Sequence, residues 1–302
     1  MIMITKFLDP RNDLAFKRIF GTPRNSDILI HFLNDILELK DDPIQTVKFL
    51  KSNQDPAVAA ERQSIVDVMC EDEKHNKFII EMQVARDPGF IKRAQYYASK
   101  TYINQRDDGV DYKDLKNVRF LAIYEEKLFS KKKSYLSYHE MRDINTQEND
   151  LNSFKFIFLE LSKFKDKKED LKTITQKWAY FFKHATKTTE ADLAKIVGSD
   201  LIIERAYQEL DRFGWSKEEL MEYDAVDMKI AAVRDALEES FSDGEKKGRK
   251  EGKEEGKEEG KEETARKMIK DNMDIEKIIK FTELPREKIE KIIKEEETPK
   301  DE

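Results

Sequence analysis

Long apolar runs are missing from this chain of 302 residues. No stretch approaches the ~20 apolar residues needed to cross a bilayer. The first residues, MIMITKFLDPRND, also lack the extended apolar run of a signal peptide. Both absences predict a cytoplasmic protein that has no contact with a membrane.

Cysteine and histidine are scarce, which excludes several kinds of site. The single cysteine, Cys70, allows no disulfide within the chain, and we interpret it as a small core residue. The histidines have no ligand spacing, which argues against a zinc site; they are His31, His75, His139 and His184.

Charge is plentiful, but its balance is acidic. Charged residues make up 39% of the chain and the formal net charge is −7. Lys and Arg supply most of the affinity of proteins that coat nucleic acid, so this balance argues against such a protein. Any contact with DNA must therefore be local.

A change of composition near Ser242 separates a large body from a small tail. The body has enough apolar residues to bury a core, because 38% of the chain is hydrophobic. The predicted parts are a core over 1–162, a helical extension over 163–242, a tether or marginal helix over 243–263, and a small helical module over 264–302.

The order of apolar patterns predicts a mixed α/β fold, that is, an α+β arrangement around a mixed sheet. Helical spacing predicts helices over 13–20, 26–39 and about 90–105. Strands are expected over 46–50, 64–84 as a hairpin, 118–124, 135–144 and 154–161. A hairpin followed by a crossover helix and another strand builds a mixed sheet whose open strand ends can carry a site.

Acids interrupt the apolar pattern of residues 64–84, SIVDVMCEDEKHNKFIIEMQV. Because strand side chains alternate, Glu81 and Gln83 share one face while Met82 points to the other. Asp67 joins them only if it lies opposite Glu81 or Gln83, and pairing with Met82 would break the site. The pattern thus predicts a hairpin that holds a metal ion.

Two neighbouring carboxylates would repel each other by roughly 3 kcal/mol at about 5 Å and an effective dielectric of about 20. A divalent cation would remove that repulsion, and hard oxygen ligands favour magnesium with several waters retained. The alternative is that Asp67 and Glu81 are polar residues on the solvent-facing side of an antiparallel sheet.

The glycine-rich run GEKKGRKEGKEEGKEEGKEE places a glycine at every fourth position from Gly244 to Gly260. Five glycines oppose helicity by roughly 5 kcal/mol, so a solvated tether or a marginal helix is expected. The alternative is a glycine seam that lets two helices approach closely in an oligomer. The following module could be a helix-turn-helix or a cap for dimerisation or docking.

Four segments stand out together: DPRNDLAFKRIFG, IVDVMCED followed by FIIEMQ, RAQYYASKTY, and FIFLELSKF. As a set they resemble the recombination-promoting nuclease (Rpn) family, also called PD-(D/E)xK nuclease family transposases, over most of residues 5–240. The resemblance implies a restriction-endonuclease-like core and DNA endonuclease activity that depends on Mg²⁺, with Mn²⁺ as a possible substitute. It also implies a link to recombination and mobile elements, and self-association through the C-terminal region.

The resemblance makes Asp67 the first metal-binding acid and Glu81 the second, while Gln83 replaces the usual lysine. The main-chain carbonyl of Met82 is expected to add a ligand, and Gln83 to orient the attacking water.

The positive charge that the missing lysine would supply must come from elsewhere, and Lys17 or Arg93 could provide it. Lys17, Arg18 and Arg93 are the candidates for contact with DNA phosphates. The competing interpretations are a surface ion pair between Asp13 and Lys17, and a packing role for Arg93. For the whole chain, the alternative to an enzyme is an inactive DNA- or protein-binding adaptor on a nuclease scaffold.

Overall fold

The computed structural model describes residues 5–51, 53–54, 64–198 and 200–297. The chain forms two compact units, Met1–Arg234 and Asp235–Glu302. Among the described residues, no helix is both long and apolar enough to span a membrane.

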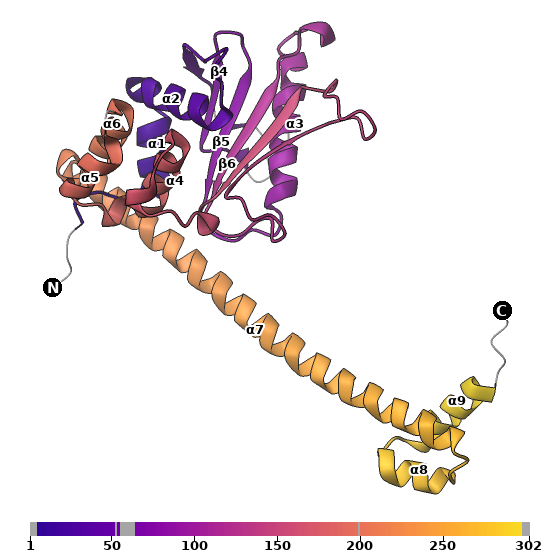
Figure 1. Ribbon diagram of the computed structural model, residues 1–302. Coiled ribbons are helices and arrows are strands. Elements are labelled where there is room, and N and C mark those ends of the chain that lie inside the picture. The colour runs from indigo at the N-terminus through magenta and orange to yellow at the C-terminus, as the bar shows by residue number, and fades with distance from the viewer. Residues whose placement is uncertain (1–4, 52, 55–63, 199, 298–302) are drawn as a thin grey trace. The chain divides into compact units, whose positions relative to one another are not determined.

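The first unit consists of a mixed sheet and surrounding helices (Figure 1). Its helices are α1 (Asp13–Phe20), α2 (Ser26–Leu37), α3 (Phe90–Asp107), α4 (Ile174–His184), α5 (Glu190–Val197), α6 (Leu201–Glu209) and the first turns of α7 (Lys217–Lys270). Its strands are β1 (Val47–Phe49), β2 (Asn53–Gln54), β3 (Ser64–Ile65), β4 (Val68–Asp72), β5 (Lys77–Gln83), β6 (Val118–Tyr124), β7 (Leu136–Glu140) and β8 (Phe154–Glu160).

The main sheet has the strand order β1-β4-β5-β6-β8-β7. β5, β6 and β8 run parallel, whereas the β1–β4, β4–β5 and β7–β8 pairs are antiparallel. This arrangement confirms the predicted mixed α/β fold. The hairpin is shorter than predicted, because β3 leaves the main sheet and pairs with β2.

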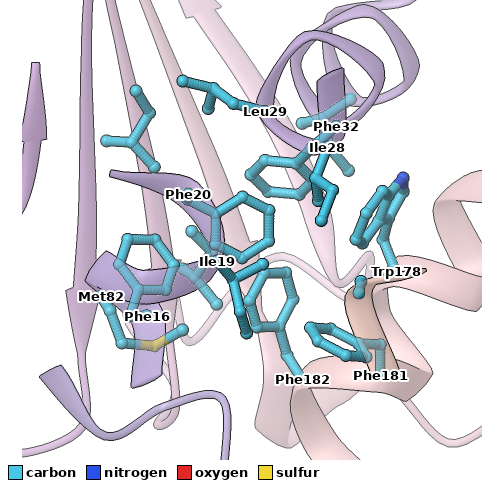
Figure 2. Close-up of a cluster of buried hydrophobic side chains, with 14 of the residues drawn as sticks. Phe16, Ile19, Phe20, Ile28, Leu29, Phe32, Met82, Trp178, Phe181 and Phe182 are labelled. Atoms are coloured by element: carbon cyan, nitrogen blue, oxygen red, sulfur yellow. The ribbon is translucent and has the colours of Figure 1, made fainter. Parts of the chain in front are cut away.

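Helices cover both faces of the sheet, with α3 on one face and α1, α2 and α4 on the other (Figure 1). The alternation of β5 divides its side chains between two cores: Ile80 and Met82 join the core under α1 and α2, and Ile79 joins the core under α3. Figure 2 shows Met82 in the first of these cores, close to Phe16. Glu81 therefore points away from the α1 core.

An aromatic cluster fills the core beneath α1, α2 and α4 (Figure 2). The Phe20 ring lies 5.0 Å from the rings of Phe16 and Phe32, and 5.7 Å from that of Phe182. Aromatic pairs at these distances stabilise the fold beyond the apolar area that they bury. This packing holds α1 against the sheet, next to the ends of β4 and β5.

The glycine-rich segment that was expected to be a tether or a marginal helix is helical and belongs to α7. A Cβ added at any of its five glycines would meet nothing within 4 Å, so packing within the chain does not require glycine there. The second unit contains the end of α7 with α8 (Ile275–Thr282) and α9 (Arg286–Glu297). Its small core consists of Ala265, Ile278, Leu284, Ile289 and Ile292. The four domain boundaries stay predictions.

Candidate active site

The two predicted acids meet at the carboxyl end of β5. Asp67 lies in a bend just before β4, not within the strand as predicted. The β4–β5 ladder pairs Val68 with Ile80, so one further step places Asp67 opposite Glu81. Asp67 leaves the strand because its Oδ2 accepts a hydrogen bond from the backbone N–H of Met82, at 2.8 Å. The strand register therefore pairs Asp67 with Glu81, as the predicted site requires, and not with Met82.

The backbone of Met82 points toward Asp67. The carbonyl of Gln83 faces β6, where it accepts from the N–H of Glu125 at 3.0 Å. Along a strand the N–H and C=O of one residue point to the same side, and successive residues alternate. The carbonyl of Met82 therefore points to the side where its N–H meets Asp67, which is compatible with its predicted role as a ligand.

Burial makes both carboxylates resist ionisation. Burial raises the pKa of Asp67 to about 6, although the N–H of Met82 and the charge of Lys17 oppose this rise. Burial also raises the pKa of Glu81, which is 5% exposed, to about 7; Arg93 opposes this rise and the Asp67 carboxylate adds to it. Two adjacent acids whose pKa values are raised in this way are typical of a functional site.

A cation from α3 lies beside Glu81. Nη2 of Arg93 is 3.7 Å from Oε2 of Glu81 and donates a hydrogen bond of 2.7 Å to Oε1 of Gln83. Nη1 of Arg93 donates to Asp87 at 2.5 Å, and the guanidinium lies over the Phe90 ring. Four neighbouring groups thus fix a positive charge beside Glu81 and Gln83.

Gln83 uses both ends of its amide within the chain. Oε1 accepts from Arg93, and Nε2 donates to the carbonyl of Ala85 at 2.7 Å. The predicted role of Gln83 in orienting water stays a prediction. What the contacts support is that Gln83 holds the guanidinium of Arg93 in place.

Lys17 and Arg18 lie on α1 in different surroundings. Lys17 forms no ion pair with Asp13 or any other described residue, and its charge favours ionisation of Asp67. Arg18 is paired with Glu219 at 2.7 Å and with Glu209 at 3.4 Å, and it stacks on Trp215. Contact between Arg18 and DNA stays a prediction, and DNA would have to compete with these carboxylates.

Two clefts meet at Asp67. The site cleft, of about 370 Å³, is lined by residues of α1, β5, α3 and α7, including Asp67, Glu81, Gln83, Arg93, Tyr97 and Lys229. A larger cleft, of about 820 Å³, is lined by Lys17, Arg18 and Trp215 among others, and also by Asp67. Asp67 therefore borders both clefts, whereas Glu81 borders the site cleft.

A family model described as PD-(D/E)XK nuclease family transposase matches residues 10–237. The chain belongs to this family. The family is one of nucleases, and the match agrees with the resemblance carried by the sequence motifs. No curated protein and no solved structure matches the chain.

PD-(D/E)XK nucleases generally use divalent metal ions, and the donors of this family member fit a hard cation. The described residues contain no group of three or more His, Cys, Asp or Glu side chains that could hold a metal ion. The candidate set is instead two carboxylates, Asp67 and Glu81, with the neutral carbonyl of Met82. Magnesium suits such a set because it retains several waters.

Two charged groups at the site were not found from the sequence. Asp87 precedes α3, accepts from the N–H of Gly89 at 2.7 Å and pairs with Arg93. Asp87 lies two residues before the N-cap Gly89, and no sequence signal pairs it with Arg93. Lys229 comes from α7, about 150 residues beyond the motif, and no sequence signal linked it to the acids.

The raised pKa values predict that the acids destabilise the metal-free fold at high pH. Above about pH 4 the unfolded chain has released these protons, whereas the folded protein holds them up to about pH 6 on Asp67 and about pH 7 on Glu81, so stability falls as pH rises through this window. We expect Glu81→Gln to raise the free energy of unfolding by on the order of 2 kcal/mol at pH 8 in EDTA, and by progressively less toward pH 5.

Urea denaturation at pH 8, 6.5 and 5 measures this effect. Glu126→Gln, at an exposed carboxylate near the end of β6, is the matched control and should change stability equally little at each pH. A Glu81→Gln protein that is less stable than the unsubstituted chain at pH 8 would contradict the prediction.

Proposed function

We propose that this protein is a DNA endonuclease that depends on a divalent cation, with Mg²⁺ preferred and Mn²⁺ able to substitute, and that it acts in recombination or on mobile elements. The observation that carries the proposal is the pair of carboxylates at the carboxyl end of β5, one buried (Glu81) and one half-buried (Asp67), in the register that brings Asp67 opposite Glu81. Membership of a nuclease family supports the reaction class.

The residues of the site have separate roles in this proposal. Asp67, Glu81 and the carbonyl of Met82 would hold the cation. The cation, when bound, supplies positive charge against the phosphate oxygens and makes the attacking water more acidic. Arg93 places a fixed cation beside the same phosphate, and Gln83 and Asp87 orient its guanidinium through their hydrogen bonds. Lys17 adds a contact from the α1 side.

The rival function is an inactive adaptor that binds DNA or protein on the same scaffold. One contact favours it: Arg93 already lies 3.7 Å from Glu81, where it partly neutralises the charge that a metal ion would meet. The enzyme and the adaptor differ in one measurable property, the metal-dependent breakage of phosphodiester bonds.

Plasmid nicking distinguishes the two. With Mg²⁺ at pH 8, we expect the unsubstituted protein to convert supercoiled plasmid to the open-circle form, and Asp67→Asn and Glu81→Gln to lower the rate by at least about a hundredfold, because each removes a charged ligand. Glu126→Gln should nick at the unsubstituted rate. Equal traces for all four proteins would reject the enzyme and favour the adaptor.

The guanidinium of Arg93 should set the pH range of nicking. Arg93 lowers the pKa of Glu81, and Glu81 must be ionised to hold a cation. Arg93→Met should therefore shift the rising limb of the pH–rate profile upward, by roughly one pH unit, in addition to slowing the reaction. Lys92→Met, at the exposed neighbouring position on α3, is the control. A slower reaction with an unmoved profile would restrict Arg93 to substrate contact.

Self-association through the C-terminal region is a further part of the proposal. The five open glycines of α7 leave its glycine face free for a second helix, and intrachain packing does not explain them. Replacing all five by alanine should strengthen the isolated helix yet lower the mass of any oligomer, measured by light scattering. An unchanged mass would count against the glycine seam.

A further inference from the structure

Lys229 is a lone cation on an acidic stretch of helix. Between residues 218 and 233 of α7 it is the only basic residue, whereas five acids share the stretch: Glu218, Glu219, Glu222, Asp224 and Asp227. A helix surface of this composition repels DNA on average. The single basic residue of this stretch, Lys229, is therefore a candidate for contact with an anion.

That position lines the same cleft as the candidate acids. Lys229 lines the site cleft with its neighbour Ile230 and with Val233 one turn further on, and Asp67 and Glu81 line it too. Within the part of the chain that the structure describes, Lys229 forms no ion pair, and its side chain is exposed. It is available to an anion that enters the cleft.

The turn that carries Lys229 is fixed to the core on both sides. Before it, the buried Tyr223 accepts a hydrogen bond from the N–H of Asp9 at 2.9 Å through its hydroxyl. The main-chain carbonyl of Tyr223 accepts a second, of 3.2 Å, from the side chain of Asn12.

After the turn that carries Lys229, Arg234 pairs with Glu125 at 3.1 Å, just beyond the end of β6. Glu125 also binds Arg11 at 2.7 Å, and Arg11 in turn binds Asp9. These contacts hold this part of α7 over the cleft.

The charges of the site cleft are not equally available. Its acids are Asp13, Asp67 and Glu81, and its cations are Arg93 and Lys229. Arg93 is committed to Asp87 and Gln83 and lies beside Glu81. Lys229 is thus the cation of this cleft that has no anionic partner among the described residues.

We propose that Lys229 binds a backbone phosphate of the DNA strand that enters the site cleft, so that the first turns of α7 form a wall of the active site. This inference rests on the proposed function, which it deepens by adding a substrate-binding residue from outside the motif. Loss of one phosphate contact weakens binding about equally for all sequences and lowers the salt dependence of binding.

The test compares Lys229→Ala with Lys217→Ala, which removes the same charge at an exposed position of α7 outside both clefts. The affinity for a fluorescent 20-base-pair duplex is measured at several salt concentrations with both variants made in the Glu81→Gln protein, which should not cut the DNA. Plasmid nicking is measured with both variants in the otherwise unsubstituted chain. Lys229→Ala should lower the slope of log affinity against log salt by about one and slow nicking roughly tenfold. Lys217→Ala should change neither, and Lys229→Arg should keep most of both.

The outcomes separate this inference from the proposed function. If the unsubstituted protein nicks and Lys229→Ala matches Lys217→Ala in slope and rate, the inference is overturned and the nuclease stands. If no protein nicks but Lys229→Ala alone lowers the salt slope, the phosphate contact stands and the enzyme fails. Absence of any DNA binding by the Glu81→Gln protein would overturn the contact.

Discussion

The site depends on holding two poorly solvated carboxylates, the buried Glu81 and the half-buried Asp67, side by side at the end of β5. Met82 lies in the aromatic core under α1, which directs Glu81 to the opposite side, while the N–H of Met82 holds Asp67 at 2.8 Å. One residue thus anchors both acids, through its side chain and through its backbone. The acids cannot separate to relieve their repulsion without disrupting the ladder or the core.

Removing the two carboxylates from water lowers the stability of the fold. Packing and charge interactions in the rest of the first unit offset this loss. A buried carboxylate loses hydration, which is why the pKa values of Asp67 and Glu81 rise to about 6 and about 7. The aromatic cluster around Phe20 and Trp178 supplies packing next to the site. The positive charge of Arg93 stabilises the ionised form of Glu81 and so offsets part of this loss. Two poorly solvated carboxylates persist side by side because the surrounding core is well packed, and this arrangement is suited to bind a cation.

The sequence predicted what depends on local patterns. Alternation in β5 was sufficient to place Glu81 and Gln83 on one face, and the caps and turns located α1 and α3 within a few residues. It did not predict that Asp67 leaves the strand, because that choice depends on a hydrogen bond to Met82 fifteen residues away. Nor could it pair Arg93 with Asp87 and Gln83, or bring α7 over the cleft, since these contacts arise only from tertiary packing.

The same packing favours a glutamine at position 83. Oε1 of Gln83 lies 2.7 Å from Nη2 of Arg93, so a lysine at this position would place a second cation beside the guanidinium. At about 4 Å and an effective dielectric of about 20, that repulsion is roughly 4 kcal/mol. Glutamine instead provides an acceptor that fixes the arginine. A cation beside Glu81 thus comes from α3, and position 83 on β5 supplies the acceptor that holds it.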